Sequence, residues 1–218
     1  MANIVDEISV RHVSDTGKKT PKRELYRMYY YDCPPYEGQQ RLPIPPEGNR
    51  TGKTINFKRH PPYVLRSNFQ EILKSKRKVA LRMGVLGGDA SWVLHPAKVK
   101  ELIKGSCQWS DLTNDDFFLD IKQKAVDLKL GMDITTMTLN KHVEVIVLVA
   151  GDADFVPAAK LARTHGVDFV LDPLWDNHSK NLSEHVDGIK SFDLVSMIQR
   201  ICRVEPIKRP DWWNDPAQ

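Results

Sequence analysis

The sequence of 218 residues predicts an α/β fold with a central, mainly parallel sheet. Residues 143–149 form a continuous apolar, β-branched run, which is typical of a strand buried on both faces. Residues 155–165 then show helical spacing and stop at Gly166, and residues 167–171 form a second apolar run. A strand, a helix and a strand in so few residues make a βαβ unit, so we expect the two strands to be parallel neighbours.

The other elements are assigned from the same kinds of pattern. Aromatic and apolar runs predict strands at residues 24–31 and 79–86, the second of which is closed by Gly87 and Gly88. Helical spacing predicts helices at residues 63–76, 96–104, 124–139 and 194–204. We expect a single domain over residues 1–204, with a Pro-rich loop insertion at 33–60 and a C-terminal tail at 205–218.

Composition limits the classes of protein to which the chain can belong. The hydrophobic share of 41% and the charged share of 28% are typical of a soluble globular protein. No apolar run approaches the roughly 18 residues of a membrane span, and the N-terminus lacks the apolar region of a secretory signal. The three cysteines, Cys33, Cys107 and Cys202, lie far apart, which indicates neither a disulfide framework nor a zinc site. We therefore expect a cytoplasmic protein with no membrane partner.

Charge is distributed unevenly along the chain. Residues 33–110 hold 14 basic and 5 acidic residues, a net charge of +9, whereas residues 111–218 hold 12 and 18, a net charge of −6. This asymmetry is typical of a protein that guides a phosphate-rich ligand toward carboxylates that hold a metal ion. Two oppositely charged, solvated surfaces would give the same counts.

Two aspartates directly follow the best-defined strand. Ligands of open parallel sheets bind beyond the carboxyl ends of the strands, and there Asp152 and Asp154 follow a turn at Gly151. A helix cap would explain one of these aspartates but not both. Two close carboxylates repel each other unless one is protonated or a cation lies between them, and oxygen ligands suit Mg²⁺ or Mn²⁺. The pattern therefore predicts a metal site.

Asp127 and Asp133 lie upstream, on the helix predicted at residues 124–139. Six positions correspond to roughly 120° around a helix, so the two side chains cannot face one ion equally. Asp127, near the helix start, is the candidate ligand, and Asp133 would either act on the ion through another ligand or pack with a partner of its own. The alternative for Asp127 is a favourable negative charge in the first helical turn.

Three runs of the sequence carry a recognisable pattern: Tyr29–Tyr36, Lys122–Asp127 with Asp133, and Val145–Pro157 followed by Gly166. These runs resemble the NYN domain family, in particular its LabA-like branch. The resemblance covers about residues 25–193 and implies a three-layer, PIN-like (Rossmann-like) fold, an acidic site for Mg²⁺ or Mn²⁺, and RNA cleavage. By position, Asp127, Asp152 and Asp154 match acidic family positions, which implies metal-binding and catalytic roles, and Asp133 matches a further one.

The N-terminus departs from the pattern of the family. NYN domains open with an apolar strand that ends in a metal-binding aspartate. Asp6 follows Ile4 and Val5 and is the candidate for that ligand, but the apolar residues at 4, 5, 8 and 13 fit an amphipathic helix at least as well. If they form a helix, we expect the chain to be truncated or diverged at its first strand.

These observations together predict a metal-dependent endoribonuclease, in which a metal-activated water hydrolyses phosphodiester bonds of single-stranded RNA. The residues expected to contact phosphates are Lys53, Lys58, Arg59 and Lys124. Tyr36, Phe57 and Tyr63 are candidates for stacking on unpaired bases, although a solvated loop whose aromatic residues pack in the core would show the same pattern. The alternative is a non-catalytic RNA- or protein-binding module with an incomplete metal site. Either function is compatible with a homo-oligomer.

Overall fold

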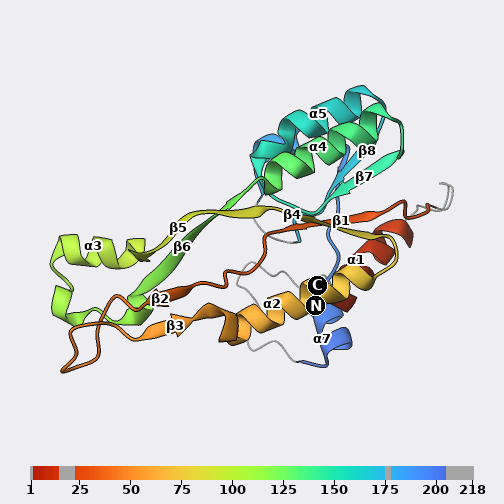
Figure 1. The fold of residues 1–218 in the computed structure, drawn as a ribbon. Coiled ribbons are helices and arrows are strands. Elements are labelled where there is room, and N and C mark those ends of the chain that lie inside the picture. The colour runs from red at the N-terminus through yellow and green to blue at the C-terminus, as the bar shows by residue number, and fades with distance from the viewer. Residues whose placement is uncertain (1, 15–22, 175–177, 205–218) are drawn as a thin grey trace. The chain divides into compact units, whose positions relative to one another are not determined.

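The computed structural model describes residues 2–14, 23–174 and 178–204, so the predicted tail at 205–218 lies outside the described residues (Figure 1). The chain divides into two compact units, which are described separately. The first unit comprises Met1–Tyr30, Leu73–Ala80 and Asp127–Gln218, and the second comprises Tyr31–Ile72 and Leu81–Val126. Within the described ranges, none of the helices has both the length and the apolar character that crossing a membrane requires.

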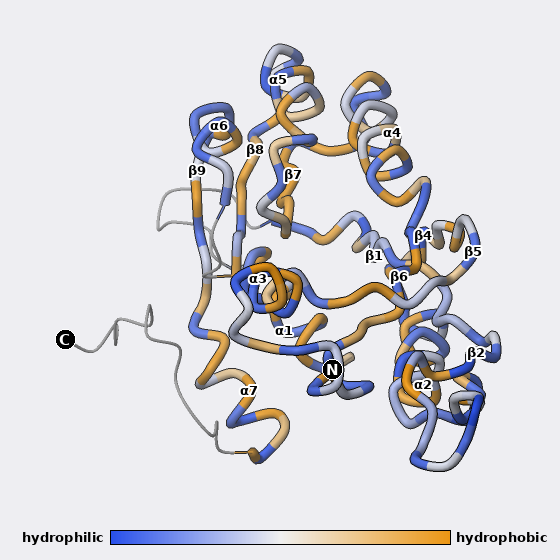
Figure 2. The backbone as a smooth tube through the Cα atoms, turned by 90° about the vertical axis from the view of Figure 1, so that its left-hand side faces the viewer, coloured by the Kyte–Doolittle hydropathy of each residue, from blue (hydrophilic) through white to orange (hydrophobic). Residues whose placement is uncertain are grey.

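The first unit contains a three-stranded parallel sheet in the order β7–β8–β9. Its strands are β7 (Val145–Leu148), β8 (Asp168–Leu171) and β9 (Gly188–Ile189). The helix α5 (Val156–Thr164) connects β7 to β8, and Figure 2 shows that these two strands are largely hydrophobic. The predicted βαβ unit and the α/β fold class are therefore confirmed, although the sheets of this protein are small.

The remaining helices of the first unit are α1 (Ala2–Ser14), α4 (Val126–Leu139), α6 (Lys180–Ser183) and α7 (Leu194–Cys202), together with the short 3₁₀ helix η4 (Ala153–Phe155). Both views place α4 and α5 side by side (Figures 1 and 2). The buried residues of α4, which are Leu130, Ile134 and Thr138, recur every four positions. This spacing places them on one face of the helix.

The strands β1 (Met28–Asp32) and β4 (Val79–Met83) form a two-stranded sheet. At one end the amide of Met28 donates to the carbonyl of Lys78 (2.8 Å), and at the other the amide of Gly84 donates to the carbonyl of Asp32 (2.7 Å). The residue numbers of the partners rise together, so the two strands are parallel. The predicted strands at 24–31 and 79–86 thus have shorter or shifted bounds.

The second unit is built on an antiparallel pair, β5 (Val85–Leu94) and β6 (Phe117–Lys124), which forms a long ribbon in Figure 1. Gly87 and Gly88 do not close a strand as predicted, because they lie within β5 at a shift in its register between Gly87 and Ser91. A glycine pair is compatible with such a bulge as well as with a turn. The predicted helix at 124–139 begins later than expected, because Lys124 is the last residue of β6.

The predicted helices at 63–76 and 96–104 are confirmed as α2 (Pro61–Ser75) and α3 (Pro96–Lys104). Three short 3₁₀ helices complete the unit: η1 (Phe57–Arg59), η2 (Trp109–Asp111) and η3 (Asn114–Asp116). The helix α3 ends where predicted because Gly105 adopts a left-handed conformation (φ +71°), which glycine tolerates better than other residues.

The Pro-rich stretch at 33–60 contains secondary structure and is not a simple loop. The strands β2 (Gln39–Arg41) and β3 (Thr54–Asn56) pair as an antiparallel hairpin. The side chain of Asn114 accepts a hydrogen bond from the amide of Ile44 (2.9 Å) and donates one to its carbonyl (3.1 Å). Strand pairing and these two hydrogen bonds order the stretch despite its prolines, which are compatible with edge strands and turns.

Candidate functional site

The parallel sheet of the first unit brings the ends of its three strands to one edge, which we call the carboxyl edge. The polar residues that follow the strands are Asp152 and Asp154 after β7, Asp172 after β8, and Ser191 after β9. Parallel α/β sheets commonly bind ligands at this edge. The carboxyl edge is therefore the candidate functional site.

Asp152 holds the turn that follows β7. Its backbone is extended (φ −82°, ψ 140°), and its Oδ1 accepts a hydrogen bond from the amide of Asp154 (3.1 Å) at the start of η4. Asp152 thus caps the helix, which is the structural role that the sequence offered for one of the two aspartates. Both side chains are exposed, so the cap leaves an open carboxylate at Asp154 and the second oxygen of Asp152.

The helix α4 carries the other two predicted acidic residues. Asp127 lies in its first turn and is exposed, whereas Asp133 lies two turns later and is partly buried. The chain passes from the C-terminus of α4 into β7, so a helix that runs back along the strand has its N-terminus toward the carboxyl edge. The topology therefore places Asp127, and not Asp133, at the end of α4 that faces this edge.

Asp6 does not end a strand. It lies in α1, so the helical alternative for the N-terminal residues is the one that the structure adopts. The carboxylate of Asp6 forms an ion pair with Lys76.

Asp172 is an acidic residue of the carboxyl edge that was not among the predicted site residues. Its side chain is 1% exposed, and Oδ2 lies 2.8 Å from Nε2 of the buried His12 on α1. Its Oδ1 accepts hydrogen bonds from the hydroxyl of Ser191 (2.6 Å) and the amide of Leu174 (2.9 Å). The sequence signal was its place directly after a buried strand, but its partner His12 is 160 positions away.

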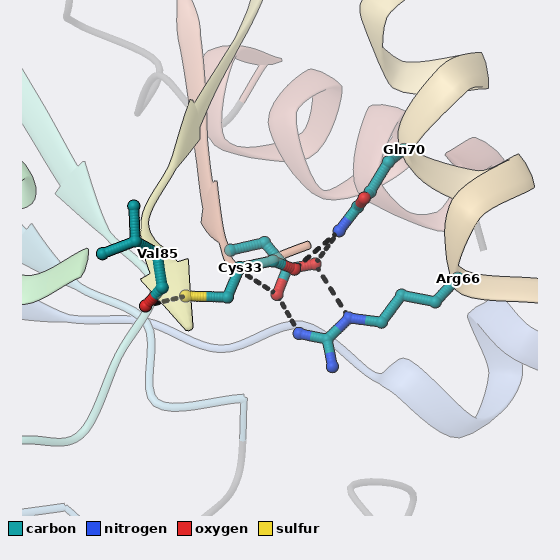
Figure 3. A network of polar contacts seen from close by, with 5 residues as sticks. Cys33, Arg66, Gln70 and Val85 are labelled. Carbon is teal, nitrogen blue, oxygen red and sulfur yellow. Dashed lines mark hydrogen bonds and ion pairs between the residues drawn. The ribbon is translucent and has the colours of Figure 1, made fainter. Parts of the chain in front are cut away.

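The second unit has a strand-end aspartate of its own, Asp32, and Figure 3 labels four residues of the surrounding network: Cys33, Arg66, Gln70 and Val85. The oxygens of Asp32 accept hydrogen bonds from both the Nε (3.2 Å) and a terminal nitrogen of Arg66, from Nε2 of Gln70 (2.8 Å), and from the amide of Cys33 (2.8 Å). Gln70 also donates to the carbonyl of Cys33 (3.0 Å), and the thiol of Cys33 lies against the carbonyl of Val85. Residues of β1, α2 and β5 are thereby held together.

The environment of Asp32 keeps this carboxylate ionised. Burial raises the pKa of Asp32, but the hydrogen bonds from Arg66, Gln70 and Cys33 and the positive charge of Arg66 outweigh it and lower the pKa below its usual value. A carboxylate offers about four lone-pair positions, and these four hydrogen bonds use them. Asp32 therefore has a structural role in the second unit and is poorly suited to bind an ion.

The hairpin of the second unit carries three of the predicted phosphate contacts. Lys53, Lys58 and Arg59 are all exposed. Lys58 forms an ion pair with Glu37 (3.2 Å), whereas among the described residues neither Lys53 nor Arg59 has an ion-pair partner. The rings of Tyr36 and Phe57, predicted to stack on bases, pack edge to face on each other (5.4 Å between centroids).

Lys124, the fourth predicted phosphate contact, lies across a glycine of the neighbouring strand. A Cβ atom added to Gly87 would lie 2.5 Å from both Cδ and Cε of Lys124. The missing side chain at Gly87 thus leaves the space that the Lys124 side chain occupies. Lys124 is exposed at the end of β6, so its ammonium group is accessible to a ligand.

The residues predicted to bind a metal ion carry the type of donor atom that a hard divalent cation prefers. Asp127, Asp152 and Asp154 supply carboxylate oxygens, which Mg²⁺ and Mn²⁺ prefer. In the described ranges, no three His, Cys, Asp or Glu side chains are close enough to hold an ion together. Magnesium is commonly bound by one or two carboxylates plus substrate phosphates and water. The pair Asp152 and Asp154 offers carboxylates of this type and number.

Comparison with known proteins identifies one family. The model of the NYN domain matches residues 95–208, which is more than half of the chain. The match includes Lys124, Asp127, Asp133, Asp152 and Asp154, and it begins after Asp6 and the hairpin. No curated protein and no solved structure matched the chain.

Proposed function

The chain belongs to the NYN domain family, and on that premise we propose that it is a metal-dependent endoribonuclease that hydrolyses single-stranded RNA at the carboxyl edge. Membership of this family connects the chain with nuclease-like, RNA-related function. The observation that carries the proposal is the capped turn after β7, which presents Asp152 and Asp154 together and exposed beyond a parallel strand. The run Gly151–Pro157 also resembles the LabA-like branch, to which we assign the chain.

In this proposal Asp152 and Asp127 hold Mg²⁺ or Mn²⁺, and Asp154 binds the ion or orients a water molecule. When bound, such an ion would lower the pKa of a coordinated water molecule and neutralise charge on the phosphate. The hydrogen bond from the amide of Asp154 engages Oδ1 of Asp152 and leaves Oδ2 for the ion. Asp133, partly buried on α4 and further from this edge, is not a ligand in this proposal and acts on the site only indirectly.

The cations of the second unit bind the RNA backbone in this proposal. Lys53, Lys58, Arg59 and Lys124 neutralise phosphates, which gives affinity without sequence preference. A single strand is favoured as substrate because its flexible backbone can follow cations that are spread over a hairpin and a strand end. We propose a cytoplasmic location, because the cysteines Cys33, Cys107 and Cys202 are all free.

The test is cleavage of a labelled single-stranded RNA by the purified chain with Mg²⁺ or Mn²⁺, compared with EDTA. Asp152→Asn keeps the size of the side chain and an oxygen for the cap but removes the negative charge, so cleavage should fall by more than about 100-fold. The matched control is Asp168→Asn, because Asp168 begins β8 at the opposite edge of the same sheet and should be dispensable.

Two results would overturn the proposal. If the wild-type chain binds RNA but does not cut it with either metal, the non-catalytic RNA-binding module is the better description. If Asp152→Asn cuts as fast as Asp168→Asn and the wild type, cleavage does not take place at the carboxyl edge.

A further inference from the structure

Asp172 is the most completely buried carboxylate at the carboxyl edge, and the proposed chemistry does not use it. Burying a polar group is unfavourable unless hydrogen bonds compensate it. Three polar groups from three segments contact the oxygens of Asp172: Nε2 of His12 on α1, the amide of Leu174 after β8, and the hydroxyl of Ser191 after β9. His12 is itself buried and packs its ring edge to face on Phe192 (4.8 Å).

The segment that begins at Asp172 is tied to the end of β7 at two points. The amide of Asp172 donates to the carbonyl of Leu148 (2.8 Å), and the amide of Ser179 donates to the carbonyl of Gly151 (2.9 Å). Gly151 directly precedes Asp152. Asp172 and Ser179 thus each donate a hydrogen bond to the stretch that leads from β7 to the turn with the candidate ligands.

This segment also contains a strained residue. Leu174 has a left-handed backbone (φ +51°), which is unfavourable for a bulky side chain. Its amide donates to Oδ1 of Asp172, so the carboxylate stabilises a turn that the local sequence does not favour. Strained residues of this kind persist only where the surrounding structure fixes them.

We propose that Asp172, together with His12 and Ser191, is a positioning residue that holds the Gly151–Asp154 turn in the geometry required for cation binding. This inference rests on the function proposed above. Asp172 is not itself a ligand, because it is buried and its oxygens already accept three hydrogen bonds.

The test uses Asp172→Asn, which keeps the shape of the side chain but replaces one acceptor oxygen with an NH₂ group that cannot accept a hydrogen bond. We expect faster hydrogen exchange of the Asp154 amide, which donates to Asp152, and an affinity for Mn²⁺ lower by roughly 10- to 100-fold in calorimetry. Neither measurement requires RNA cleavage.

The matched control is Asp187→Asn. Asp187 accepts hydrogen bonds from the amide of Phe169 (2.9 Å) and Nε of Arg163 (2.8 Å), but it precedes β9 at the opposite edge of the sheet. Its loss should lower stability while leaving Asp154 exchange and Mn²⁺ affinity unchanged. Equal effects of the two variants on both readouts would reduce Asp172 to a general structural role and overturn the inference.

The outcomes separate this inference from the proposed function. If the wild type binds no Mn²⁺, the metal site is refuted. Hydrogen exchange of the Asp154 amide in Asp172→Asn then decides whether Asp172 holds the turn, and unchanged exchange overturns the inference. If Asp172→Asn does not fold, Ser191→Ala replaces it, because it removes one donor and keeps the carboxylate. Ser191→Ala should shift exchange and affinity in the same direction by a few-fold, and no shift would overturn the inference.

Discussion

In the second unit, the strand-end carboxylate of Asp32 is 10% exposed and accepts four hydrogen bonds. In the first unit, Asp152 also lies at a strand end, but it is exposed and its carboxylate accepts one hydrogen bond from the described residues. Asp32 is the last residue of β1 and Asp152 lies four positions after β7, so the sequence places both aspartates at the end of a predicted strand. The difference is in the partners that surround them. Arg66 and Gln70 fill the oxygens of Asp32, while Asp152 keeps an oxygen for a ligand.

The same distinction applies to the cations of the hairpin. Lys58 already has a partner in Glu37, whereas Lys53 and Arg59 have none among the described residues. A charged residue becomes a good candidate for binding when its charge is exposed and not already matched. This criterion ranks residues that the sequence pattern treats as equivalent.

The largest expected difference between Asp32 and Asp152 is in their contribution to stability. Asp32→Ala should lower the free energy of unfolding by about 2 kcal/mol, because it removes the buried carboxylate that accepts hydrogen bonds from Arg66, Gln70 and the amide of Cys33. The loss stays below that of a fully buried ion pair because the Arg66 side chain is 40% exposed. Asp152→Ala should cost about 1 kcal/mol at most, the value of a helix cap. Urea unfolding measures both.

The reverse order of these two stability losses would contradict the contrast between Asp32 and Asp152. A larger loss of stability for Asp152→Ala than for Asp32→Ala would mean that the carboxyl edge is the structural site. Asp32→Asn serves as the control for side-chain volume, and it should also destabilise the protein because its NH₂ group would face the donors of Arg66 or Gln70.

Much of the fold of the first unit was predictable because its signals are local. The apolar run that contains β7, the helical spacing of α5 and the left-handed Gly166 (φ +80°) after it are all encoded in neighbouring residues. The second unit was less predictable, because β6 and the far half of β5 form through pairing with each other, as Trp92 does with Leu119. Strand pairing of this kind depends on context more than on intrinsic propensity.

The candidate site shows the same limit. Asp152 and Asp154 could be identified from their place after a buried strand, and the capping role of Asp152 was a named alternative. The network of Asp32 depends on residues 34 and 38 positions away, and that of Asp172 on a residue 160 positions away. No local pattern shows which oxygens such distant partners fill.

A second, smaller effect concerns pH. The pKa of Asp32 is lowered from its ordinary value of 3.8, so its hydrogen bonds stabilise the folded chain fully above that value. The stabilisation is then lost as the pH falls below 3.8 through the lower pKa of the folded state. The difference in stability between the wild type and Asp32→Asn should therefore be constant near neutral pH and shrink as the pH falls below 3.8.

Unfolding curves recorded at a series of pH values test this expectation. Asp187→Asn is a useful reference, because Asp187 also has a lowered pKa but belongs to the first unit. A difference for Asp32→Asn that stays constant down to pH 2 would contradict an ionised, hydrogen-bonded Asp32.

The smallest effects are expected among the hairpin cations, where single changes should alter the salt dependence of RNA binding. Lys53→Ala and Arg59→Ala each remove an exposed charge that has no ion-pair partner among the described residues. Each should therefore reduce the slope of log affinity against log salt by about 0.7, which is the value for one phosphate contact on a single strand. Lys58→Ala should reduce it by less than about half of that, because the hydrogen bond from Lys58 to Glu37 engages its ammonium and raises its pKa.

Glu37→Gln separates the effect of this pairing from the effect of position on the hairpin. In the wild-type background it releases Lys58, so RNA should bind more tightly and with a steeper salt slope, whereas in the Lys58→Ala background it should not steepen the slope. Fluorescence anisotropy of a labelled single strand at several salt concentrations measures all these slopes. Equal slopes for Lys53→Ala and Lys58→Ala, with no effect of Glu37→Gln, would show that an existing partner does not decide which hairpin cations bind RNA. The distinction between matched and unmatched charges would then apply to the buried carboxylates of this protein and not to its exposed cations, where a surface ion pair is weak enough to be exchanged for a phosphate.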